Sequence, residues 1–135
     1  MIEINNLTTN AVDEEFLRKV AKIVLEREKK EKADLSIALV GQGRIRELNK
    51  KYRKKNRTTD VLAFPDKEKG SGEIVICLRE VRKNAKKFGF VFEKEIARVL
   101  IHGTLHLLGY DHEKSKLEAE KMRRKEEDYL SKFSS

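Results

Sequence analysis

The residues best suited to chemistry are three histidines, the only ones in this 135-residue chain, which fall within eleven consecutive positions. His102 and His106 are four positions apart, so on a helix their rings project from one face. Gly109 follows one turn later, and glycine readily adopts the left-handed conformation that ends a helix and reverses the chain. Such a reversal can bring His112 to the same metal ion. Three protein nitrogens leave a fourth position for water, so we expect one catalytic Zn²⁺ per chain, used for hydrolysis.

The alternative is that these histidines are structural, as core or capping side chains. Residues 93–108 form the longest apolar helical pattern of the chain, so this helix should be central and buried. Two imidazoles buried there without polar partners would be costly. The glycine turn and the third histidine therefore favour the metal site.

The same spacing matches the zinc-binding motif of the metzincin proteases, His-Glu-x-x-His-x-x-Gly-x-x-His. The three ligands and the glycine of that motif coincide with His102, His106, His112 and Gly109. The glutamate, which is the general base that activates water in those proteases, is replaced by Gly103. A metzincin-like zinc metalloprotease is therefore the second hypothesis, weakened by the missing catalytic group.

Basic segments suggest an anionic partner. Six basic residues lie in the eight positions 50–57, and a second basic cluster lies in positions 79–87. Arginine offers a planar fork that suits a phosphate group, although a solvated helix end explains most of the lysines equally well. The net charge of +8 and the isoelectric point of about 9.6 attract polyanions, of which nucleic acid is the commonest in cells.

Several of these segments resemble the YbeY family of bacterial endoribonucleases. Residues 102–112 are similar to its signature HGxLHLxGYDH, and residues 49–65 and 72–76 resemble two further blocks. A trailing acidic pattern of the family corresponds loosely to Glu126 or Glu127. The resemblance covers nearly the whole chain. The departures are mild: Glu73 where aspartate is more frequent, and Thr58 where proline is frequent.

The resemblance implies a metal-dependent, single-strand-specific endoribonuclease that acts in ribosomal RNA maturation, notably at the 3′ end of the small-subunit RNA, and in ribosome quality control. It implies that the three histidines are zinc ligands and that an arginine important for activity corresponds to Arg53. The implied partners are single-stranded RNA, ribosomal RNA and the small ribosomal subunit, with neither a membrane nor a small-molecule cofactor.

Two residues near the expected metal ion, Arg53 and Asp111, have possible roles of their own. Arg53 could offset charge that the phosphate gains in the transition state. Asp111 lies beside a ligand and could accept a proton or orient a ligand imidazole, or it could be a plain turn residue. A third hypothesis is a non-catalytic ribosome-assembly module with structural zinc. That site would need a fourth protein ligand, and Cys77 is the only thiol.

Hydrophobic periodicity predicts the elements that position these residues. Strands are expected at residues 2–4, 35–40, 61–64 and 74–78, with Pro65 ending the third. Helices are expected from Asp13 and over residues 44–54, 79–88, 93–108 and 115–133. The expected fold is α/β: one domain over residues 1–135, with a small four-stranded sheet packed with about five helices, and the family resemblance implies that the sheet is mixed. The chain has no apolar run near bilayer length, no signal-peptide pattern and a single cysteine, so a cytoplasmic location is expected.

Overall fold

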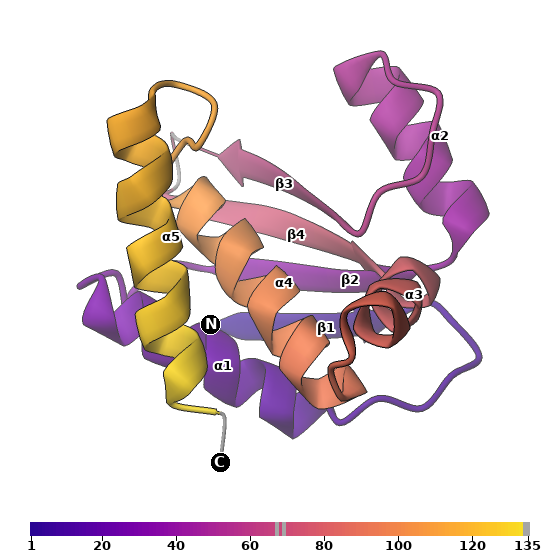
Figure 1. Ribbon diagram of the computed structural model, residues 1–135, viewed down its shortest axis with the longest axis horizontal. Coiled ribbons are helices and arrows are strands. Elements are labelled where there is room, and N and C mark those ends of the chain that lie inside the picture. Colours follow the sequence, from indigo (N-terminus) through magenta and orange to yellow (C-terminus); the bar gives the residue numbers. More distant parts are fainter. Residues whose placement is uncertain (67, 69, 134–135) are drawn as a thin grey trace.

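In the computed structural model the described residues are 1–66, 68 and 70–133. They form a four-stranded mixed sheet and five helices, so the predicted α/β class is confirmed (Figure 1). The elements are β1 (Ile2–Asn6), α1 (Glu14–Arg27), β2 (Leu35–Val40), α2 (Gln42–Arg53), β3 (Val61–Asp66), β4 (Ser71–Cys77), α3 (Leu78–Phe88), α4 (Phe92–Leu107) and α5 (Lys116–Ser131). None of the helices in these residues is long and apolar enough to cross a membrane.

The sheet has the strand order β1-β2-β4-β3, and only β3 runs antiparallel to its neighbour. Alternate residues of β4 face two different apolar clusters, because successive side chains of a strand point to opposite faces. Ile74 and Ile76 belong to the larger cluster with α1 and α4, whereas Val75 and Cys77 pack with Ile45 of α2. The sheet therefore lies between α2 on one face and the layer that contains α1 and α4 on the other, and Figure 1 shows α2 standing apart from those helices.

The prediction that Pro65 ends the third strand is wrong. β3 continues to Asp66, with Pro65 paired to Gly72 of β4. β3 is an edge strand, and an edge strand tolerates proline because the position that lacks an N–H can face away from the sheet. β4 correspondingly begins at Ser71, earlier than predicted, and positions 67 and 69 between the two strands lie outside the described residues.

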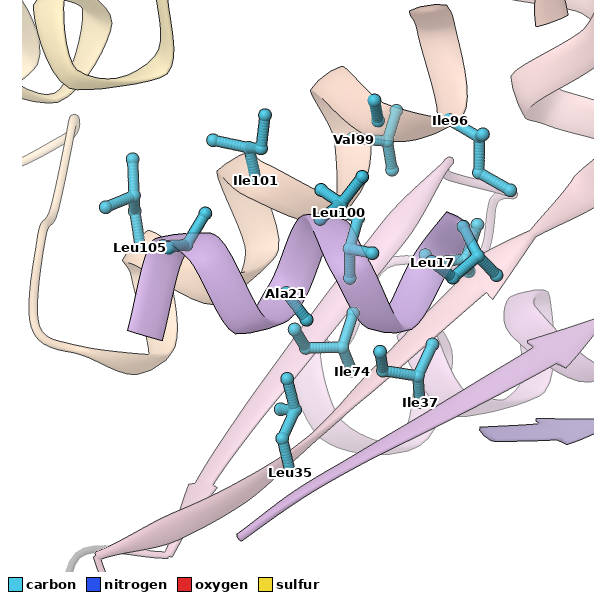
Figure 2. Close-up of a cluster of buried hydrophobic side chains, with 14 of the residues drawn as sticks. Leu17, Ala21, Leu35, Ile37, Ile74, Ile96, Val99, Leu100, Ile101 and Leu105 are labelled. Carbon is cyan, nitrogen blue, oxygen red and sulfur yellow. The ribbon is translucent and has the colours of Figure 1, made fainter. Parts of the chain in front are cut away.

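α4 is the central element, in contact with α1, α3, α5, β3 and β4. Figure 2 shows Leu100 and Leu105 of this helix within the apolar cluster that also contains Leu17 of α1 and Ile37 of β2. Gly103 allows the close approach to the sheet, since a Cβ there would lie 3.1 Å from a Val61 methyl carbon and 3.2 Å from an Ile74 methyl carbon. The position that carries the general base in the metzincin motif is thus packed against the sheet, and a side chain there would require Val61 and Ile74 to shift by a few tenths of an ångström.

The chain reverses after α4 as the sequence predicts. Gly109 has a φ of +105°, and the Tyr110 N–H donates to the Leu105 carbonyl at 3.1 Å, which closes the end of the helix. The helix itself ends slightly before the predicted position, at Leu107. This reversal determines where the residues that follow Gly109 lie relative to the last turn of α4.

A partly buried carboxylate fixes the far side of this turn. Glu28, at the C-terminal end of α1, accepts hydrogen bonds from the hydroxyls of Tyr110 (2.7 Å) and Tyr129, and it pairs with Lys125 at 3.3 Å. Burial raises the pKa of Glu28, but the hydrogen bonds from Tyr129, Tyr110 and Lys125 outweigh it and hold this pKa below its ordinary value of 4.5. Burial and the same contact raise the pKa of Tyr110 to about 12. The turn is thereby tied to α1 and to α5.

Glu28→Gln is expected to lower the free energy of unfolding at neutral pH by about 1–3 kcal/mol, because the donors lose a charged acceptor. Since the folded-state pKa of Glu28 is lowered, its stabilisation is present above pH 4.5 and is lost as the pH falls through the folded-state value. The difference in stability between wild type and Glu28→Gln should therefore shrink in urea titrations below pH 4.5. Glu31→Gln, at an exposed position nearby, is the control. A difference that stays constant between pH 7 and pH 3 would contradict this role.

Candidate metal centre

The three histidines meet at the C-terminal end of α4. His102 and His106 lie on the last turns of the helix, and His112 lies in the segment that follows the Gly109 reversal. The ring centroids are 5.3 Å apart for His102 and His112, 5.9 Å for His106 and His112, and 6.1 Å for His102 and His106. None of the three is buried in the core. Their exposure argues against the core-histidine alternative.

The spacing of these rings is slightly wide for a shared metal ion. Imidazoles that bind one tetrahedral zinc through nitrogens at about 2.0 Å have ring centroids about 5 Å apart, so His102 and His106 would have to close by roughly 1 Å. As the side chains stand, the described residues contain no group of three or more His, Cys, Asp or Glu that could hold a metal ion. Whether the three histidines fit a zinc ion therefore depends on small movements of their rings and on which ring nitrogens can donate a lone pair.

The donor chemistry fits a metal. His106 Nδ1 lies 2.8 Å from the Tyr110 carbonyl oxygen, which can only accept, so this nitrogen carries the proton and Nε2 keeps its lone pair. His102 Nδ1 contacts a carboxylate oxygen of Glu126, which favours the same tautomer. Metal-binding histidines usually donate their second ring nitrogen to a carbonyl or a carboxylate, and such a bond fixes the ring orientation. Two of the three candidate ligands have this support.

Glu126 has no role that its own position in the sequence predicts. It lies on α5, 24 positions from His102, and its only sequence signal is the loose match to the trailing acidic pattern. The neighbouring Glu127 instead pairs with Arg123 on the same helix. The structure therefore separates the two: Glu126 contacts a candidate ligand, and Glu127 is a surface residue.

A cleft of about 480 Å³ brings all the predicted site residues together. It is lined by Tyr52, Arg53, Val61, Leu62, Ala63, Phe64, His102, Gly103, His106, Asp111, His112 and Glu113. Since consecutive residues of β3 take part, the cleft runs along the outer edge of this strand rather than over one face. α4 and the segment that follows it contribute the histidines from one side of the sheet, and the end of α2 reaches the cleft from the other.

Arg53 is the last residue of α2, where Lys54 adopts a left-handed conformation with a φ of +57°. Its side chain is exposed and makes no ion pair with any described residue. Arg98, by contrast, is held by Glu95 at 2.7 Å and by Asp60 at 3.8 Å. The guanidinium of Arg53 is therefore available to an anion that enters the cleft.

Asp111 has at least a turn role, because its Oδ1 accepts the backbone N–H of Glu113 at 2.9 Å. The ring nitrogens of His102 and His106 contact Glu126 and the Tyr110 carbonyl, so Asp111 does not orient these imidazoles. It does line the cleft. Within the described part of the chain its second carboxylate oxygen has no hydrogen-bond donor, which leaves proton transfer open to it.

Cys77 is not placed to complete a closed zinc site. It is fully buried at the end of β4, among Val40, Ile45 and Leu62, and it is not among the residues that line the cleft. Burial raises the pKa of its thiol, which disfavours the thiolate that binds metals. The structural-zinc hypothesis thus loses the fourth ligand that it required.

Comparisons with known proteins show which family the chain is similar to. The sequence pattern of the family described as Endoribonuclease YbeY matches residues 3–134. An Endoribonuclease YbeY from Aquifex aeolicus is 39% identical over 133 residues, covering 95% of this chain and 89% of the relative. One from Persephonella marina is 38% identical over 123 residues, covering 86% and 80%. The solution structure of TM1509 from Thermotoga maritima superposes with a TM-score of 0.69 at 34% identity, over 96% of this chain and 87% of the other.

Glu126→Gln is expected to weaken zinc binding about tenfold to a hundredfold, because removing the partner of a ligand imidazole has effects of this size. Zinc affinity measured by competition with a chelating dye is the readout. Glu127→Gln, one position along the same helix, should bind zinc like wild type. If the two variants bind zinc equally well, Glu126 does not support the metal.

Proposed function

Because the chain belongs to the YbeY endoribonuclease family, we propose that it is a zinc-dependent endoribonuclease that cleaves single-stranded RNA. We assign it to ribosomal RNA maturation, notably at the 3′ end of the small-subunit RNA, and to ribosome quality control. Its proposed partners are ribosomal RNA and the small ribosomal subunit, so its site of action is the cytoplasm. The observation that carries the proposal is one cleft in which three imidazoles and an unpaired arginine of a strongly basic chain meet.

The zinc ion would be held by His102, His106 and His112, and when bound it supplies Lewis acidity and lowers the pKa of bound water to roughly 7. The protein's own part begins with orientation: Glu126 and the Tyr110 carbonyl contact Nδ1 of two of the rings, which leaves the other ring nitrogens available to the metal ion.

The remaining groups act on the phosphate and on the proton. Arg53 presents two parallel N–H donors to the phosphate oxygens, which gain negative charge in the transition state. Asp111 lines the same cleft, and we assign its second carboxylate oxygen to accept the proton of the attacking water. Water then adds to phosphorus as one P–O bond of the RNA backbone breaks, and the leaving oxygen takes up a proton from solvent.

The direct test is a comparison of substrates. Protein loaded with one equivalent of zinc should cleave a single-stranded RNA and leave both the same sequence in a duplex and casein intact. A chelator should stop the reaction, and His106→Ala should lose both bound zinc and cleavage. Intact single-stranded RNA after incubation with metal-loaded, folded protein would refute the function, and cleaved casein would favour the protease.

Arg53→Lys is expected to keep the fold, the zinc and most of the RNA affinity, but to cleave about a hundredfold more slowly. Lysine cannot make two parallel hydrogen bonds, and losing one such donor in a catalytic site costs on the order of 3 kcal/mol. The rates should be single-turnover rates on one RNA, with zinc content and melting temperature measured for each variant.

Lys54→Ala and Lys55→Ala are the matched controls for this comparison. They remove neighbouring charges outside the residues that line the cleft and should cleave nearly as fast as wild type. A near wild-type rate for Arg53→Lys would reduce Arg53 to one more surface charge.

A further inference from the structure

An aromatic side chain stands exposed beside the candidate metal centre. Tyr52 directly precedes Arg53 on the last turn of α2, and 56% of it is exposed to solvent. Its ring makes an edge-on contact with Phe64 of β3, with the centroids 5.2 Å apart and the planes at 67°. Phe64 in turn packs against the apolar cluster between α2 and the sheet. Tyr52 is thus supported from one side while much of its surface remains open.

Both rings line the cleft that holds the three histidines. Arg53 is the next residue after Tyr52, so a nucleotide whose phosphate reaches the Arg53 guanidinium brings a base close to the Tyr52 ring. On the other side in sequence, the exposed Lys51 has its Nζ over the Tyr52 ring, 5.2 Å from the centroid, and a base that stacks there takes the place of this ammonium group. An aromatic face flanked by two cations is the combination with which proteins bind single strands, because bases stack on the ring while the cations contact phosphates.

From this juxtaposition we propose that Tyr52, backed by Phe64, is a stacking platform for one unpaired RNA base next to the phosphate that is cleaved. The platform gives the site its preference for single strands. A base within a duplex is already stacked and paired, whereas an unpaired base can turn onto the ring. The inference rests on the proposed ribonuclease function and adds to it a residue that recognises the substrate.

The test uses the full-length, zinc-loaded chain and a short single-stranded RNA that carries 2-aminopurine, whose fluorescence is quenched when it stacks. The protein has no tryptophan, so the reporter signal is not obscured. Rapid mixing records binding before cleavage. Wild type and Tyr52→Phe should quench the reporter and bind alike. Tyr52→Ala should bind about tenfold more weakly and lose the quenching.

Phe88→Ala is the matched control. Phe88 is 53% exposed and has Lys87 Nζ 5.6 Å from its ring centroid, yet it lies on α3 and not among the residues that line the cleft. It should bind and quench like wild type. Tyr52→Leu separates stacking from apolar contact, since leucine keeps an apolar side chain but has no aromatic face. Unchanged melting temperatures exclude unfolding as the cause of any loss.

The outcomes separate this inference from the function on which it rests. If wild type quenches the reporter and Tyr52→Ala does not, the stacking platform is supported even when no RNA is cleaved. In that case only the proposed ribonuclease function fails. Cleavage by wild type with unchanged binding by Tyr52→Ala overturns the platform and leaves the function standing. The platform is also overturned if Tyr52→Leu binds and quenches like wild type, because the surface then serves an apolar partner. An equal loss of binding and quenching in Phe88→Ala overturns it as well.

Discussion

The packing of α4 against the sheet is the constraint on which the site depends. The helix is buried on nearly every side, and between Glu95 and His106 the residues that reach solvent form one stripe at intervals of four: Arg98, His102 and His106. Burial of the other faces fixes the rotation of the helix about its axis, and this rotation determines where the two imidazoles point. Gly103 allows the short distance between α4 and the sheet, because a side chain at this position would be tightly packed against Val61 and Ile74.

Local sequence signals were enough to predict how the histidines come together at the end of α4. The spacing of His102 and His106 and the conformational freedom of Gly109 depend only on residues near in sequence, and both predicted features are found in the structure. Glu126 belongs to a helix that reaches His102 only when the chain has folded, so no local pattern marks it. The same holds for Pro65, since whether a proline ends a strand depends on whether that strand lies at the edge of the sheet.

Tyr110 links the stability of the fold to the geometry of the site. Its carbonyl accepts the hydrogen bond that orients His106, while its hydroxyl donates to Glu28. The backbone carbonyl that contacts the candidate ligand His106 is therefore anchored through the side chain of the same residue. A small domain has few elements with which to rigidify a turn, and this turn joins α4 to contacts on both α1 and α5.

The location of the cleft follows from the single antiparallel strand. β3 ends the sheet on one side, and an exposed strand edge is a surface on which other chains can pair. Here that edge lies between two layers, and each contributes different side chains to the cleft. The histidines come from the layer of α4, and Tyr52 and Arg53 come from α2 on the opposite face. The two groups rest on separate apolar clusters, one beneath α4 and one beneath α2. The candidate metal ligands and the candidate anion-binding arginine line one cleft only where the sheet stops, so neither cluster alone can form it.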